Sequence, residues 1–331
     1  MKSQKIEITP KTIVFTITTL LLLKFIWIIK DLVFSLFIAF IIVSALKPAV
    51  EFLVKKRVPR LLASIIVFFL FLFVIINAFA IILPPLIGEV SHFFRTLPHI
   101  LRTIAYSFPI SLQIETITQY IPNITTQAFD VIKGVFSNAI FVVSTLFFSF
   151  YLLLEDNILQ KGLTKYLDLS IATPIINVIQ VAEKRMSAWF WGEIILMTVI
   201  GVMTFIGLNL IGMKYVLALS VLAGLLEVIP NIGPITSLIP AFLIGVSESY
   251  FLGFTTISLY FIIQQLENHL IVPVVMRRAV GLSPLVTLIS LIIGGKLAGV
   301  FGVLLSVPTT LFLETALVEF MKIKKQNVQI R

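Results

Sequence analysis

Ionisable and amide side chains lie inside strongly apolar sequence in the last third of the chain. Five such residues and one neighbouring glycine form this set: Glu227, Asn231, Gly233, Gln264, Glu267 and Asn268. On a helix, Gln264, Glu267 and Asn268 would share one face, because they are spaced i, i+3 and i+4. A carboxylate at membrane depth is costly and usually serves a function, such as binding a proton or a cation. We therefore predict that these residues bind an ion or a small polar substrate.

Each group in this set has a second interpretation. Glu227 could lie at an interface and accept hydrogen bonds from backbone N–H groups that the nearby prolines free. The polar stripe around Glu267 could belong to a helix that has already left the membrane. Lys296 is a possible charge partner for Glu227, but a lysine near a membrane surface can also extend its ammonium group into water. The sequence leaves these alternatives open.

Other kinds of chemistry have little support in the sequence. The chain has no cysteine and three histidines, so we expect no metal site and no disulfide. It lacks a phosphate-binding Gly-Lys-Ser/Thr loop, a nucleophile elbow and a His-Glu-x-x-His motif. We therefore expect no enzyme and no cofactor, apart from a coupling proton or Na⁺. The basic residues lie between apolar runs, where they set membrane orientation, so nucleic acid is not an expected partner.

The elements that must position these residues are two long apolar stretches broken by helix-breaking residues. The first, 215–246, is interrupted from Pro230 to Pro234. The second, 280–314, contains Pro284 as a further break residue and is interrupted at Gly294-Gly295-Lys296. Broken backbone has unpaired polar groups, so it survives at membrane depth only inside protein or beside a polar cavity. Paired broken segments of this kind are typical of the binding sites of transporters.

Composition predicts an all-α polytopic membrane protein. Of 331 residues, 59% are hydrophobic and only 12% are charged, and the mean hydropathy is +1.09. Soluble domains are about 25% charged. The apolar residues form continuous runs and not alternating ones, which argues against a β-barrel. We predict about eight membrane segments, two of which are broken, re-entrant hairpins of opposite orientation that meet near the midplane.

The hydropathy pattern divides the chain into five parts. Three apolar runs occupy the N-terminal scaffold, and the third of them ends at Pro84-Pro85. An extracytoplasmic amphipathic segment of two or three helices follows, then a fourth spanning helix with a cytoplasmic amphipathic segment, the transport core and a basic tail. The predicted boundaries are 1–87, 88–134, 135–191, 192–319 and 320–331.

Charge bias predicts the orientation. With the N-terminus in the cytoplasm, 18 of the 25 Lys and Arg residues fall on the cytoplasmic side, as does the C-terminus. The first broken stretch then enters and leaves on the outer side, and the second enters and leaves on the inner side. Residues 234–239 also align with residues 284–289, an offset of 50 positions. Such opposed orientation is what an inverted repeat requires.

Motifs in this region resemble those of the autoinducer-2 exporter family of bacterial and archaeal membrane permeases. The matching segments lie in fixed order over roughly the last third of the chain: Glu227-Val-Ile-Pro-Asn-Ile-Gly-Pro234, Gln265-Leu-Glu-Asn-His-Leu-Ile-Val-Pro273, Val280-Gly-Leu-Ser-Pro284, Gly294-Gly295, Gly299-Val-Phe-Gly302 and Ser306-Val-Pro308. Members of the family are linked to export of autoinducer-2 or to sodium or lithium/proton antiport. The resemblance implies a secondary transporter without fixing its substrate.

We therefore expect a multi-pass protein of the cytoplasmic (inner) membrane that works by alternating access. Its expected partners are the lipid bilayer, a small-molecule or ion substrate and further copies of itself in a homo-oligomer. The substrate would be a small polar signal such as autoinducer-2. The alternatives are a Na⁺(Li⁺)/H⁺ antiporter with no organic substrate, an exporter of a lipid or peptide, a channel, and a membrane scaffold without transport activity.

Overall fold

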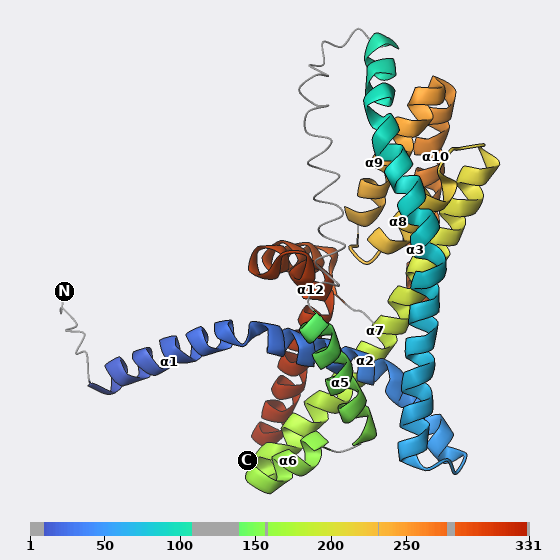
Figure 1. Cartoon of the computed structure of the whole chain (residues 1–331). Coiled ribbons are helices and arrows are strands. Elements are labelled where there is room, and N and C mark those ends of the chain that lie inside the picture. The colour runs from blue at the N-terminus through green and yellow to red at the C-terminus, as the bar shows by residue number, and fades with distance from the viewer. Residues whose placement is uncertain (1–9, 108–138, 156–157, 231, 277–281, 330–331) are drawn as a thin grey trace, which may run out of the picture.

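In the computed structural model, every described element is a helix (Figure 1). The described residues are 10–107, 139–155, 158–230, 232–276 and 282–329. Four helices among them are long and apolar enough to cross a membrane, and shorter apolar helices accompany them. They lie within 30–55, 60–100, 169–210 and 285–322. The prediction of an all-helical membrane protein is therefore confirmed.

Three helices form the N-terminal part. They are α1 (Pro10–Ile28), α2 (Lys30–Lys55) and α3 (Arg60–Ser107). In Figure 1, α1 extends away from the other helices, and its described side chains are mostly exposed. The prediction that the third run ends at Pro84-Pro85 is wrong, because α3 continues through both prolines. A proline removes one hydrogen bond, but hydrocarbon offers the remaining backbone groups no partner outside a helix.

The middle of the chain forms α5 (Ala139–Leu154), α6 (Ile158–Tyr166) and α7 (Leu169–Leu210). Helix α7 joins the predicted cytoplasmic amphipathic segment to the predicted transport core without a break at residue 191. The predicted amphipathic helices beyond residue 107 lie outside the described residues, whereas residues 88–107 belong to α3.

The first broken stretch folds into α8 (Val216–Leu226) and α9 (Ile232–Glu248), so the predicted break is confirmed. Helix α10 (Tyr250–Leu266) follows and continues into the π-helix η1 (Glu267–Ile271) and the short α11 (Val272–Val275). Helices α8, α9 and α10 gather beside α3 and the C-terminal half of α7 (Figure 1). An ion pair of 3.0 Å from Lys214 Nζ to Glu248 Oε1 joins the two ends of the α8–α9 hairpin.

The second broken stretch, α12 (Pro284–Gln329), also contains a reversal, but not where the sequence predicted it. The backbone leaves helical geometry at Ala298 and Gly299, and Gly299 has a φ of 57°. The break was predicted at Gly294-Gly295-Lys296. Glycine has two uses here, since Gly299 supplies the positive φ of the turn and Gly294 lies against the backbone of the returning arm.

Two observations show that the arms of α12 fold back on each other. The hydroxyl of Thr310 donates a hydrogen bond of 2.7 Å to the Ser290 hydroxyl, twenty positions earlier. A Cβ atom added to Gly302 would overlap the carbonyl group of Gly294, so the two backbones are in direct contact. Small residues at such contacts are typical of helix pairs in membranes.

Helix α7 is the element on which both reversals pack. The α8–α9 hairpin lies against its C-terminal half, where Gly201 faces the backbone of Gly224. The returning arm of α12 lies against its N-terminal half, where Met186 and Trp189 pack with Val307 and Leu311. The expectation that the two hairpin tips meet is therefore wrong for the described residues: each tip has its own neighbours.

Candidate functional site: a buried cluster of carboxylates

Three glutamate side chains converge in the unit made by α7, α8, α9, α10 and η1. Glu193 comes from α7, Glu227 directly follows α8, and Glu267 begins η1. Their exposed fractions are 7%, 3% and 4% respectively. Buried glutamates are rare in proteins unless they are paired, and three of them meet here with no lysine or arginine among the partners that the structure shows for them. This carboxylate cluster is the strongest candidate for a functional site.

The α8–α9 turn brings Glu227 to the cluster. Helix α8 ends because Pro230 cannot continue its hydrogen bonds, and α9 starts two residues later. The turn is tight: the Gly233 N–H donates to the Ile229 carbonyl at 2.9 Å. A Cβ at Gly233 would overlap the Leu226 carbonyl oxygen. The predicted role of Gly233 as a permissive backbone position therefore agrees with its place in the fold.

A local change of helix type places Glu267. Its carbonyl accepts from the Val272 N–H, five residues on, which is the π-helical pattern. The extra residue per turn rotates the side chains that follow. The prediction that Asn268 shares a face with Gln264 and Glu267 is therefore wrong, because it assumed α-helical spacing: Asn268 is exposed, whereas the Gln264 amide hydrogen-bonds to Glu267.

The Glu227 and Glu267 carboxyl groups lie within hydrogen-bonding reach of each other, and Glu193 is near enough to both to repel them. In each of the pair, Oε2 is buried without a hydrogen-bond donor. Two facing carboxylates cannot both stay ionised in a region of low dielectric unless a proton or a cation lies between them. In the described part of the chain, no group of three or more acidic or histidine side chains has an arrangement suited to a metal ion. A proton shared between the Glu227 and Glu267 carboxyl groups satisfies this geometry.

The other predicted residues lie at or away from this cluster. Pro230 is in the α8–α9 turn, Pro234 is in the first turn of α9, and Pro284 is the first residue of α12. Asn231 lies outside the described residues. Lys296 is exposed near the α12 tip, which shares a hollow with Lys30 and Asp31. No ion pair joins Lys296 to Glu227 in the described residues, so its exposed position agrees with the alternative of a lysine that extends into water.

Glu193 is the site residue that sequence reasoning missed. It follows Trp189 and Trp191, which indicate a membrane interface, so its position resembles the polar start of an apolar run. The signal was present nonetheless, since Glu193 is the only ionisable residue between Arg185 and Lys214. The rule that singled out Glu227 would have found it.

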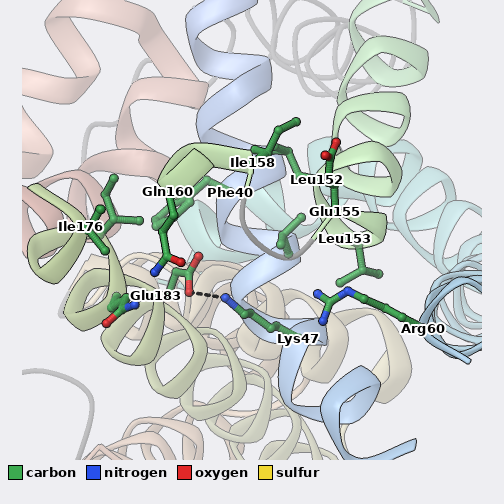
Figure 2. A pocket seen from close by; sticks show the side chains of 13 residues that line it. Phe40, Lys47, Arg60, Leu152, Leu153, Glu155, Ile158, Gln160, Ile176 and Glu183 are labelled. Atoms are coloured by element: carbon green, nitrogen blue, oxygen red, sulfur yellow. Dashed lines mark hydrogen bonds and ion pairs between the residues drawn. The ribbon is translucent and has the colours of Figure 1, made fainter. Parts of the chain in front are cut away.

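A polar hollow lies between the middle of α2, the C-terminal end of α5 and the N-terminal part of α7 (Figure 2). Its cavity has a volume of about 80 Å³. Apolar side chains such as Phe40 and Leu153 line it, and at its polar edge Lys47 Nζ contacts Glu183 Oε2 at 2.7 Å. Here each acid has a base nearby, which is the ordinary arrangement of a structural ion-pair network. The carboxylate cluster has no such compensation.

Comparison with known proteins agrees with the motifs in the C-terminal third. The profile of the AI-2E transporter family matches residues 15–322. The chain belongs to the AI-2E transporter family. The match confirms the family that the motifs indicated and extends it over nearly the whole sequence.

Curated relatives in this family cover most of the chain. "AI-2 transport protein TqsA" of Escherichia coli (strain K12) is 28% identical over 305 residues, covering 88% of this chain and 85% of its own length. "Putative transport protein YueF" of Bacillus subtilis (strain 168) is 26% identical over 306 residues, covering 86% and 83%. A second B. subtilis relative, "Putative transport protein YrrI", is 22% identical and covers 95% of both chains. Family membership therefore supports a role in membrane transport.

Proposed function

We propose that this protein is a secondary-active transporter whose coupling ion binds between Glu227 and Glu267. The observation that carries the proposal is the pair of facing, buried carboxyl groups without a basic partner. Such a pair binds a proton readily and releases it when water or a cation reaches the site. Alternating access would expose the cluster first to one side of the membrane and then to the other. Transport in the AI-2E family is consistent with this role.

The candidate cargo is a small polar signal such as autoinducer-2, as the name of the E. coli relative suggests. A Na⁺(Li⁺)/H⁺ antiporter is the second candidate, and a specific observation favours it. The cluster itself consists of carboxylates and one amide, a donor set that suits protons or hard cations better than it suits an organic molecule. In this second case Glu227 and Glu267 would bind the proton and the cation in alternation.

Topology also forms part of the proposal. We place the protein in the cytoplasmic membrane with both termini inside, on the charge bias of its loops. The α8–α9 hairpin re-enters from the outer side, because helices of 11 and 17 residues extend only about 16 and 25 Å, short of a hydrocarbon core of about 30 Å. Its tip then holds the carboxylate cluster inside the membrane.

A flux assay on the purified protein in proteoliposomes tests the proposal. The wild type is given outward gradients of autoinducer-2, Na⁺ or Li⁺, and proton movement is followed with an internal pH-sensitive dye. Glu227→Gln should abolish substrate-dependent proton movement and leave the detergent-solubilised protein monodisperse, and Glu267→Gln should do the same. Glu51→Gln, at an exposed position of α2, is the matched control and should transport normally. Full activity of both cluster variants would overturn the proposal.

A further inference from the structure

Buried polar atoms without a hydrogen-bond partner concentrate in the unit that holds the carboxylate cluster. Among the described residues there are four, and all belong to this unit: Thr204 Oγ1, Glu227 Oε2, Tyr260 Oη and Glu267 Oε2. Two of them are the carboxylate oxygens already described. The other two are hydroxyl groups, on α7 and α10, that the proposed ion site does not use. An unpaired hydroxyl in a closed interior is unfavourable, so both require a partner that the protein chain does not supply.

The two hydroxyl groups lie on the same helix faces as the glutamates. Thr204 follows Glu193 by eleven residues on α7, which is three helical turns and about 16 Å along the axis. Tyr260 precedes Glu267 by seven residues, two turns and about 10 Å along α10. Their exposed fractions are 1% and 7%. Both side chains therefore point into the unit. Tyr260 lies nearer to the level of the cluster than Thr204 does, and both lie on the side where α7 and α9 end.

Further hydroxyl groups lie along the same interior, but these have ordinary partners. Ser220, Ser237 and Thr256 are buried and donate to carbonyls of their own helices, at 3.0, 3.0 and 2.8 Å. Ser237 is the polar neighbour of Tyr260, yet its proton is already committed to the Pro234 carbonyl, and the Tyr260 hydroxyl finds no partner of acceptable geometry. Their oxygens can still accept hydrogen bonds from a third party. Together with the Thr204 and Tyr260 hydroxyls, these three groups supply the two to four polar contacts that a buried water molecule needs.

An apolar cluster closes the far end of this row. Leu208, Leu219 and Ile244 pack around Tyr260, and Ile100 of α3 completes the cover. Polar side chains thus recur from the glutamates toward Tyr260 and Thr204, and an apolar cluster surrounds the row at the level of Tyr260. Such an arrangement matches a route to one face of the membrane that is shut in the present conformation.

We propose that Thr204, Tyr260 and Ser237 line a water-filled track along the inside of the unit, and that protons reach Glu227 and Glu267 through it. We call these three residues the hydroxyl track. The water chain and the hydroxyl groups pass a proton by making and breaking O–H bonds in series, so each group ends the step with the number of protons it began with. The track's role as a proton route rests on the proposed function, whereas its hydration is independent of it.

Hydration is tested by cysteine reactivity, which is clean because the native chain has no cysteine. The full-length protein in liposomes carries either Thr204→Cys or Ser237→Cys and is treated with a small hydrophilic methanethiosulfonate. Ser149→Cys is the matched control, because Ser149 is as deeply buried as Ser237 and donates to its own helix in the same way, but lies on α5. Both track cysteines should react at least tenfold faster than the control. Equal rates at all three positions would overturn the proposal.

The proton route is tested with Tyr260→Phe and Thr204→Val in the proteoliposome assay. Each should slow substrate-dependent proton movement about tenfold without lowering the melting temperature, since no protein partner loses a hydrogen bond. Tyr166→Phe and Thr198→Val, at exposed positions, should transport like the wild type. If Glu227→Gln is inactive but both track variants are fully active, the proton route is wrong and the proposed function stands. If Glu227→Gln is active, the proposed function fails, whatever the cysteine reactivity shows about hydration.

Discussion

At the residue scale, the main property of the carboxylate cluster is that the protonation of one carboxyl group depends on the charge of the other. The Glu227 and Glu267 carboxyl groups are each other's nearest ionisable neighbours, and neither has a basic partner among the contacts that the structure shows. The energy of one therefore depends on the charge of the other. A structural ion pair would behave differently, because removing either member would leave an uncompensated opposite charge.

This dependence predicts a non-additive double-mutant cycle. Glu227→Gln and Glu267→Gln should each leave the thermal unfolding midpoint unchanged or raise it, because each removes one of two buried carboxyl groups that cannot both stay ionised. The double variant should gain less than the sum of the two, with a coupling of about 0.5–3 kcal/mol, as for residues in contact. Differential scanning fluorimetry of the detergent-solubilised variants measures the midpoints.

The control cycle replaces Glu267 and the distant, exposed Glu51, whose effects should add to within about 0.5 kcal/mol. Additive behaviour of the Glu227 and Glu267 pair would show that the two carboxyl groups do not interact in the folded protein.

At the element scale, the reversal within α12 depends on glycine in two different ways. Gly299 supplies a left-handed backbone conformation, whereas Gly294 and Gly302 let two helical arms touch. The Ser290–Thr310 hydrogen bond holds the same arms together further from the turn. Close contact between arms replaces the hydrophobic driving force, which is absent between helices surrounded by lipid.

Gly302→Leu should therefore open the α12 hairpin. The added side chain would overlap the Gly294 backbone, and overpacking of this kind costs about 1–3 kcal/mol. The expected result is a lower melting temperature and faster trypsin cleavage of the C-terminal region. Gly88→Leu is the matched control, because nothing lies within 4 Å of a Cβ at that position of α3. A Gly302→Leu variant as stable as the control would contradict the close contact.

The sequence located the elements better than it located their breaks. Pro230 and Pro234 lie together, so the α8–α9 turn was predictable. In α12, by contrast, Gly294, Gly299 and Gly302 have different structural roles. Composition alone does not say at which of them the chain reverses. The prolines of α3 gave a wrong prediction for a related reason. A proline can mark either the end of a helix or a kink within one, and the sequence alone does not distinguish the two.

The candidate site was predictable where a single rule applied. Glu227 and Glu267 stood out as acids in apolar sequence. Asn268 was assigned to the same face by α-helical spacing, and the π-helix at Glu267 shifts that spacing. Glu193 fits the same rule, because it is the only ionisable residue between Arg185 and Lys214. The hydroxyl track depends on which helix faces meet, a property of tertiary packing that no local pattern contains.

At the scale of the whole molecule, the two reversals differ in how far they reach. The α12 tip shares a hollow with Lys30 and Asp31, the connection between α1 and α2. From Val300 to Lys322, the returning arm of α12 is about 33 Å long, enough to cross a hydrocarbon core of about 30 Å. We therefore expect this arm to span the membrane, whereas the α8–α9 hairpin stops at the buried cluster.

Single cysteines distinguish a spanning α12 hairpin from one that stops at the midplane. In right-side-out membrane vesicles, Asp31→Cys, Lys296→Cys and Ser247→Cys should react with a membrane-impermeant maleimide added outside. Lys322→Cys should react only after the vesicles are opened, because the charge bias of the loops predicts that the basic C-terminal end lies inside. If Lys296→Cys is unreactive from either side, the α12 tip is buried at the midplane; if Ser247→Cys and Lys322→Cys react from the same side, the opposed orientation of the two hairpins is wrong. Because each outcome assigns a different depth to Lys296, the same four variants also decide whether its ammonium group can ever approach Glu227.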